Sequence, residues 1–187
     1  MTVVANVRDE EVTELAPVLG RPDEFCRALH ARLVGSLCLY LGDAGLAEEL
    51  AQDAFVRVIE RWPSVSTMAA PEAWTYRVAF NLANSRLRRR MAEHRAHQRD
   101  RVGPVAACDV DVAEVVAVRA AIADLPPRQR RAVILRFYGD LSIDQVAAAM
   151  GCRPGTVKAH LHQAMTSLRA AGLTAPDDVR RSQEDPS

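Results

Sequence analysis

The sequence lacks the features of a secreted, membrane-spanning or catalytic protein. Its four cysteines form no C-x-x-C pair and no zinc-ligand spacing, so neither a disulfide framework nor a metal site is indicated. It has no long apolar run and no basic leader followed by an apolar segment, so we expect a cytoplasmic protein without membrane insertion. Phosphate-binding glycine loops, H-E-x-x-H, G-x-S-x-G and paired catalytic carboxylates are also absent, so we expect no enzyme and no cofactor.

Aromatic residues are few, at 5% of the chain, and no segment of β-branched residues alternates over a length that would demand a sheet. Apolar residues recur at helical spacing instead. The sequence therefore predicts an all-α fold, with two small helical domains joined by a flexible linker. The predicted parts are a disordered N-terminal tail (1–20), a first domain (21–101), the linker (102–113), a second domain (114–172) and a polar C-terminal tail (173–187).

The formal net charge of zero conceals an alternation of sign along the chain. Acidic residues outnumber Lys and Arg by 11 to 5 in residues 1–60. Lys and Arg outnumber acidic residues by 9 to 3 in residues 61–101, and by 7 to 2 in residues 128–172. Because phosphate binding depends on where cations cluster, these two basic blocks favour a nucleic-acid partner.

Residues 141–171 have the spacing of a helix-turn-helix. Ser142 can cap the first helix, and Gln145, three residues later, completes a capping box. Pro154 suits the first turn of the second helix, where its missing N–H would have no partner. The small contact, the turn and the apolar anchor that the motif needs are supplied by Ala147, Gly151 and Val157. The alternative is an ordinary helical hairpin, and few hairpins satisfy all three positions.

The other apolar periodicities predict five more helices. Their ranges are 22–41, 46–62, a helix from Glu72 into the basic run, 113–125 and 128–138, with a turn at 42–45 and a loop at 63–71. The helix from Glu72 is expected to bury Trp74, Val78 and Leu82.

Two of these helices carry polar outer faces. The outer face of the helix at 46–62 is mainly acidic and consists of Glu49, Gln52, Asp53, Val56 and Glu60. The alternative is an ordinary solvated surface. The outer face of the helix from Glu72 combines amides with arginines, and the alternative is a solvated basic helix end. The residues of this face are Arg77, Asn81, Asn84, Ser85, Arg86, Arg88, Arg89 and Arg90.

The second helix of the helix-turn-helix is expected to enter the major groove of DNA with its N-terminal part. Lys158 and Gln163 can pair with base edges, and Arg153 with a phosphate. His160 and His162 do not indicate a metal site, because residues two apart on a helix point in different directions. The whole predicted face is Arg153, Thr156, Lys158, Ala159, His160, His162 and Gln163.

The order of these segments resembles that of bacterial RNA polymerase sigma factors of the extracytoplasmic-function (ECF) group, over about residues 22–171. AEELAQDAFVRVIERW is similar to the core-binding helix of that family, and WTYRVAFNLANSRLRRR to its promoter −10 helix. DLPPRQRRAVILRFYGDLSIDQVAAAMGCRPGTVKAHLHQAMTSLR is similar to its −35 domain.

The resemblance implies partners and roles for the predicted faces. The acidic face would meet the clamp coiled coil of the largest subunit of core RNA polymerase, and the flap of the second subunit is the other implied contact. Asn81 would help hold an extruded base of the −10 element, with the loop at 64–70 forming part of its pocket, while the arginines that follow would bind phosphates of promoter DNA. An anti-sigma factor is a further partner that such proteins commonly have.

The sequence departs from the family at two positions of the −10 helix. Phe80 stands where an Arg commonly precedes the Asn, and Ser85 where an acidic or amide residue is frequent. The recognition helix also has two histidines and Gln163 where Arg is common, so its DNA preference is expected to differ or its contact to be weaker.

The leading interpretation is therefore a sigma factor that binds core polymerase, recognises the −35 and −10 elements and promotes promoter opening. The alternative is a free-standing helix-turn-helix regulator, which has no evident need for the acidic helix and the Asn/Arg helix in this order. A helical adaptor or an enzyme is disfavoured by the two basic blocks.

Overall fold

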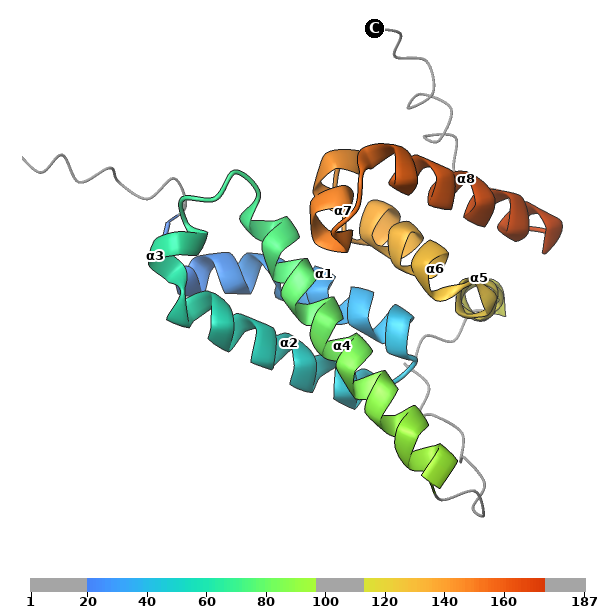
Figure 1. The fold of residues 1–187 in the computed structure, drawn as a ribbon, viewed down its shortest axis with the longest axis horizontal. Helices are drawn as coiled ribbons and strands as arrows, with labels where there is room; N and C mark the ends of the chain where they lie inside the picture. Colours follow the sequence, from blue (N-terminus) through green and yellow to red (C-terminus); the bar gives the residue numbers. More distant parts are fainter. Residues whose placement is uncertain (1–19, 97–112, 174–187) are drawn as a thin grey trace, which may run out of the picture.

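The computed structural model describes residues 20–96 and 113–173, and every regular element in these two ranges is a helix (Figure 1). Two helical bundles follow one another along the chain. The first contains α1 (Pro22–Leu41), α2 (Ala44–Glu60), α3 (Trp62–Val65) and α4 (Pro71–Ala96). The second contains α5 (Ala113–Asp124), α6 (Pro127–Val133), the π-helical turn η1 (Ile134–Tyr138), α7 (Ile143–Met150) and α8 (Pro154–Ala170). The all-α prediction is confirmed.

The junction of α1 and α2 explains a small error in the predicted boundaries. Gly42 ends α1 in the left-handed region, with a φ of 71°, a conformation that glycine adopts without steric cost. The carboxylate of Asp43 accepts a hydrogen bond from the Leu46 N–H at 3.0 Å and caps α2. The helix therefore begins at Ala44, so Gly45 lies inside it rather than in a turn.

The predicted loop at 63–71 is partly helical. Residues Trp62–Val65 form the short helix α3, and the Thr67 hydroxyl donates a hydrogen bond to the Ser64 carbonyl oxygen at 3.0 Å. This turn buries Val65 and Ser66, which anchors the segment to the first bundle.

The buried face of α4 differs by about one residue from the prediction. Trp74, Val78 and Leu82 are only half-buried. The fully buried side chains of α4 are Ala73, Thr75, Tyr76, Ala79, Phe80 and Ala83. The predicted buried face was wrong because α4 is covered on two sides, by α1 and α2 on one and by α7 on another. Its buried surface is therefore wider than the single apolar stripe that the prediction assumed.

The helix-turn-helix is confirmed in detail. The Ser142 hydroxyl accepts a hydrogen bond from the Gln145 N–H at 3.2 Å, and the Gln145 amide oxygen accepts one from the Ser142 N–H at 2.8 Å. Gly151 has a φ of 67° and ends α7, and Val157 is fully buried where α8 packs on α7. The turn and the anchor fix the angle at which α8 leaves the bundle.

The two bundles share one apolar core, which the sequence did not predict. Tyr76 and Phe80 of α4 belong to the same buried cluster as Leu135, Leu141 and Val146 of the second bundle. In Figure 1 the second bundle lies against α1 and α4. The predicted tails and linker fall outside the described residues, apart from Gly20, Ala113 and Leu173 at their edges.

Candidate nucleic-acid interface

The predicted acidic face lies on the solvent side of α2. All five of its residues are exposed: Glu49, Gln52, Asp53, Val56 and Glu60. Ile59 lies among them with 53% of its side chain exposed, the same value as Val56, and it was not among the predicted residues. Two exposed aliphatic residues between carboxylates give this face an apolar centre with a charged rim, which is typical of protein interfaces.

The predicted DNA-binding face of α4 is exposed in most but not all of its length. Six of the eight residues are exposed: Arg77, Asn81, Arg86, Arg88, Arg89 and Arg90. Asn84 and Ser85 are half-buried, so the expectation that both face outward is only partly right. The buried Tyr40 hydroxyl donates a hydrogen bond to Asn84 Oδ1 at 2.7 Å, which ties this amide to α1.

Acidic residues of α2 and its N-cap neutralise part of the arginine cluster. Arg86 lies 3.8 Å from Glu49, and Arg90 lies 3.8 Å from Asp43. These pairs line a polar cleft of about 520 Å³ between α2 and α4. Arg77, Arg88 and Arg89 have no ion pair with a described residue, so they are the exposed cations of this helix that are most available to a phosphate.

The recognition helix α8 presents its N-terminal half to solvent. Arg153, Thr156, Lys158, Ala159 and His162 are exposed, and Val157 between them is the buried anchor. The start of the helix faces open space, since a Cβ placed on Gly155 would meet no atom within 4 Å. This end of α8 can therefore approach a groove without rearrangement.

Two predicted residues of α8 are less free than expected. His160 is half-buried, and its Nε2 is buried without a hydrogen-bond partner among the described residues. Gln163 is exposed, but its Oε1 accepts a hydrogen bond from Gln129 Nε2 at 3.1 Å. Gln163 therefore offers a base edge mainly its amide N–H groups while this bond persists.

Three arginines of the second basic block donate hydrogen bonds to backbone carbonyl oxygens. Arg131 Nη2 donates to the Ala149 carbonyl oxygen at 2.6 Å, and Arg136 Nη1 to the Leu141 carbonyl oxygen at 3.1 Å. Arg130 donates to the carbonyl oxygens of Ala123, Leu125 and Tyr40. The number of basic residues in this block therefore overstates the positive charge that a phosphate could meet.

Burial changes the titration of two groups near this site. Desolvation lowers the pKa of Arg131, although the nearby Tyr40 opposes this and Arg77 adds to it. Desolvation raises the pKa of Tyr40, against the pull of Arg131 and Arg130. The Tyr40 hydroxyl therefore stays protonated and remains a donor for Asn84.

Residues 20–96 and 113–173 contain neither a candidate metal site nor a candidate membrane span. No group of three His, Cys, Asp or Glu side chains is arranged there to hold a metal ion. None of the helices described in these ranges combines the length and the apolar character that a membrane span requires.

Two sequence families match the two bundles. Sigma-70 region 2 matches residues 26–93, and Sigma-70, region 4 matches residues 116–168. Among curated proteins, the chain is 33% identical to an RNA polymerase sigma-E factor of Streptomyces avermitilis, over 79% of this chain and 82% of that protein. It is 31% identical to the ECF RNA polymerase sigma factor SigC of Mycobacterium tuberculosis, over 96% and 99% of the two chains.

Solved structures share the fold. The sigma factor RpoE of Bartonella quintana, crystallised with the anti-sigma factor NepR, superposes with a TM-score of 0.69. The match covers 80% of this chain and 96% of that chain at 23% identity. The two-bundle helical architecture is therefore one already seen in experimental structures.

Proposed function

Because this chain belongs to the ECF family of RNA polymerase sigma factors, we propose that it binds core polymerase through α2 and reads promoter DNA through α4 and α8. It acts in transcription initiation, and the polymerase supplies the chemistry. The chain itself has no catalytic role in this proposal. Its place of action is the cytoplasm, where core polymerase and the chromosome are found.

The observation that carries the proposal is the geometry of the helix-turn-helix. The capping box fixes the start of α7, Gly151 sets the turn, and Val157 anchors α8 so that Lys158 faces solvent. A helix held in this way can present a few side chains to base edges in the major groove. Lys158 is an exposed cation of that surface, as is Arg153, and His162 lies one turn beyond Lys158.

The role of α4 at the −10 element is supported by the exposure of Asn81 and Arg77, which lie four residues apart on one helix face. An amide offers both a donor and an acceptor to the edge of an unpaired base. Arg88 and Arg89 follow on the same helix and would bind phosphates, which position a strand without specifying its sequence.

The role of α2 in polymerase binding is supported by its exposed aliphatic centre and acidic rim. Val56 and Ile59 supply apolar area, and Asp53 and Glu60 supply charge that would complement a basic coiled coil. Asp53 has no ion pair within the described part of the chain, so its charge is available to a partner.

An anti-sigma factor is the remaining proposed partner. The sigma factor RpoE of Bartonella quintana, which shares the fold, was crystallised with the anti-sigma factor NepR. Affinity capture of the tagged chain from cells, followed by mass spectrometry, tests this partner. Recovery of polymerase subunits with no second regulatory protein would contradict it.

Run-off transcription tests the proposed function directly. Purified core polymerase is incubated with the chain and a genomic promoter library, and the native chain is compared with Asn81→Ala and Lys158→Ala. We expect defined transcript starts only when the native chain is present. Each variant should reduce these starts, and Lys158→Ala should do so most at promoters with a complete −35 element.

Matched variants separate a missing DNA contact from a change of charge or fold. Arg169→Ala removes one positive charge from the exposed C-terminal end of α8 and should leave the starts unchanged. Asp53→Asn should weaken core binding, whereas Glu24→Gln on α1 should not. If the chain binds duplex DNA without polymerase and directs no starts, the free-standing regulator replaces the sigma factor.

A further inference from the structure

A glutamine on α6 is hydrogen-bonded to a glutamine on the recognition helix. Gln129 Nε2 donates to Gln163 Oε1, and the two atoms are 3.1 Å apart. Gln163 is exposed on α8, whereas Gln129 is half-buried on α6. The oxygen of the Gln163 amide is therefore turned toward the protein.

Gln163 belongs to the face of α8 that is proposed to enter the major groove. It lies four residues after Ala159, and His162 lies four residues after Lys158. All four side chains are exposed, and residues four apart on a helix share one face. Gln163 can therefore approach base edges in the same groove as Lys158.

Gln129 lies behind this face. Its Oε1 atom is buried and has no hydrogen-bond partner among the described residues. Its Nε2 atom is bonded to Gln163. Both polar atoms of the Gln129 amide are thus directed at the protein, so this residue influences DNA only through Gln163.

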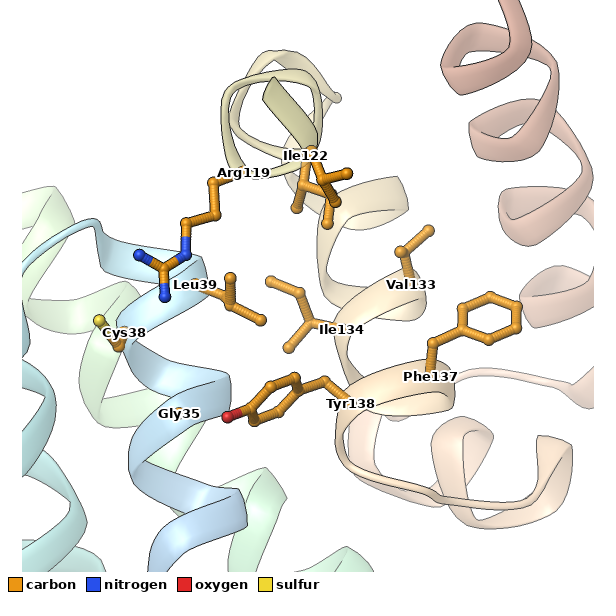
Figure 2. A pocket seen from close by; sticks show the side chains of 10 residues that line it. Gly35, Cys38, Leu39, Arg119, Ile122, Val133, Ile134, Phe137 and Tyr138 are labelled. Atoms are coloured by element: carbon orange, nitrogen blue, oxygen red, sulfur yellow. The ribbon is translucent and has the colours of Figure 1, made fainter. Parts of the chain in front are cut away.

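The packing of α6 on α8 holds Gln129 in place. Val133, four residues after Gln129, lies in a buried cluster with Ala164 of α8, so Gln129 faces α8 as well. Figure 2 shows the next residue, Ile134, pointing toward Leu39 of α1. Contacts on two sides restrict the movement of α6, which gives the bond between the glutamines a fixed origin.

The direction of the Gln163 amide decides which base it can recognise. A glutamine with a free amide reads adenine through two bonds, in which its oxygen accepts from N6 and its nitrogen donates to N7. This contact requires both amide atoms to point at the base together. When Oε1 of Gln163 is bonded to Gln129, the N–H groups remain for DNA, and guanine presents two acceptors, O6 and N7.

We propose that Gln129 is a positioning residue that changes the base preference of Gln163 from adenine to guanine. Thymine, which presents the acceptor O4, is the next preferred base, and cytosine, which presents an N–H donor, is the least preferred. This inference rests on the proposed function, because it concerns the −35 element that α8 is proposed to read. It deepens that function by naming a residue outside the recognition helix that selects a base.

The test measures base preference at one position of the −35 element. Core polymerase and the full chain transcribe a barcoded promoter library that is randomised across this element, and the transcript barcodes are sequenced. The base pair whose preference disappears in Gln163→Ala is the one that Gln163 contacts. In the native chain, we expect guanine to exceed adenine there by roughly fivefold, the low end of what a good base contact supplies.

Two substitutions of Gln129 should alter this preference in different ways. Gln129→Leu removes the bond and frees the Gln163 amide, so the preferred base should change from guanine to adenine. Gln129→Glu offers only acceptors, so Gln163 should turn its nitrogen toward α6 and its oxygen toward the groove. The bases with N–H donors, adenine and cytosine, should then be preferred. Leucine and glutamate are good helix formers, so α6 is not weakened.

Two controls separate positioning from a general effect on fold or charge. Arg128→Leu places the same side chain at the adjacent, exposed position of α6 and should leave the base preference unchanged. In the Gln163→Ala background, Gln129→Leu should have no further effect on the preference, because Gln129 acts through Gln163. A merely structural role of Gln129 would instead lower transcription from all promoters by the same factor.

The outcomes separate this inference from the proposed function. If the native chain directs transcript starts, but both Gln129 variants keep its ratio of guanine to adenine, the positioning role is wrong and the sigma function stands. A native preference for adenine, or a Gln163→Ala variant that alters no position, also overturns the positioning role alone. If the native chain directs no starts with core polymerase, the sigma function fails and this inference fails with it.

Discussion

Two arginines of α4 and two of α6 have opposite environments, although both helices contribute to basic blocks of the sequence. Arg88 and Arg89 on α4 are exposed and have no ion pair with a described residue. Arg130 and Arg131 on α6 are partly or largely buried, and they donate to backbone carbonyl oxygens. The charge of a segment therefore indicates a nucleic-acid surface only when the cations are free to meet a phosphate.

The largest effect should come from removing the most buried cation. Arg131→Ala eliminates a charged hydrogen bond to the Ala149 carbonyl and the contact with Phe80. We expect the free energy of unfolding to fall by about 2–3 kcal/mol, measured by urea denaturation. Arg128→Ala on the same helix is exposed and should change it by less than about 0.5 kcal/mol. Equal effects of the two variants would contradict the comparison.

The exposed arginines should affect DNA binding rather than stability. Arg88→Ala and Arg89→Ala together should weaken promoter binding by the polymerase complex. They should also reduce the slope of log affinity against log salt by about 0.7 to 0.9 for each phosphate that an arginine no longer neutralises. Fluorescence anisotropy with labelled promoter DNA at several salt concentrations measures this slope. An unchanged slope would mean that neither arginine meets a phosphate.

A smaller effect is expected inside the first bundle, where α1 supports α4. Tyr40→Phe keeps the buried ring but removes the hydroxyl that donates to Asn84. The absence of this hydrogen bond should cost about 0.5 to 1.5 kcal/mol of unfolding free energy. Combining it with Asn84→Ala in a double-mutant cycle isolates the pair, and additive costs would show that the bond contributes nothing.

The smallest effect is expected for the surface ion pair of α4. Glu49→Gln removes the partner of Arg86, and both side chains are about half exposed. Exposed pairs contribute little, so thermal unfolding should show a change of less than about 0.5 kcal/mol. A cost comparable to that of Arg131→Ala would show that exposure does not distinguish the two sets of arginines.

Local signals in the sequence predicted the helix-turn-helix most accurately. Ser142, Gln145 and Gly151 act through neighbours a few residues away, so their spacing is sufficient to place the capping box and the turn. Apolar periodicity also predicted which residues form the outer face of α2, because one side of that helix meets solvent along its whole length.

The sequence could not reveal contacts between distant segments. The predicted register of α4 was wrong because the second bundle covers Tyr76 and Phe80, and the local sequence pattern does not indicate this burial. The burial of Arg131 was not predicted for the same reason. Arg131 lies four residues before the buried Leu135, so the two share one helix face. This spacing was the signal in the sequence that could have indicated the burial of Arg131. Residues of the DNA-reading and polymerase-binding faces remain predictions that the experiments above test.

The shared core of Tyr76, Phe80, Leu135 and Leu141 makes the contact between the bundles sensitive to temperature. Burial of apolar surface carries a large heat-capacity change and weakens on cooling. The attraction between the bundles therefore declines in the cold. The same apolar cluster continues into the first bundle, so cooling should loosen the contact between the bundles and the packing of the first bundle together.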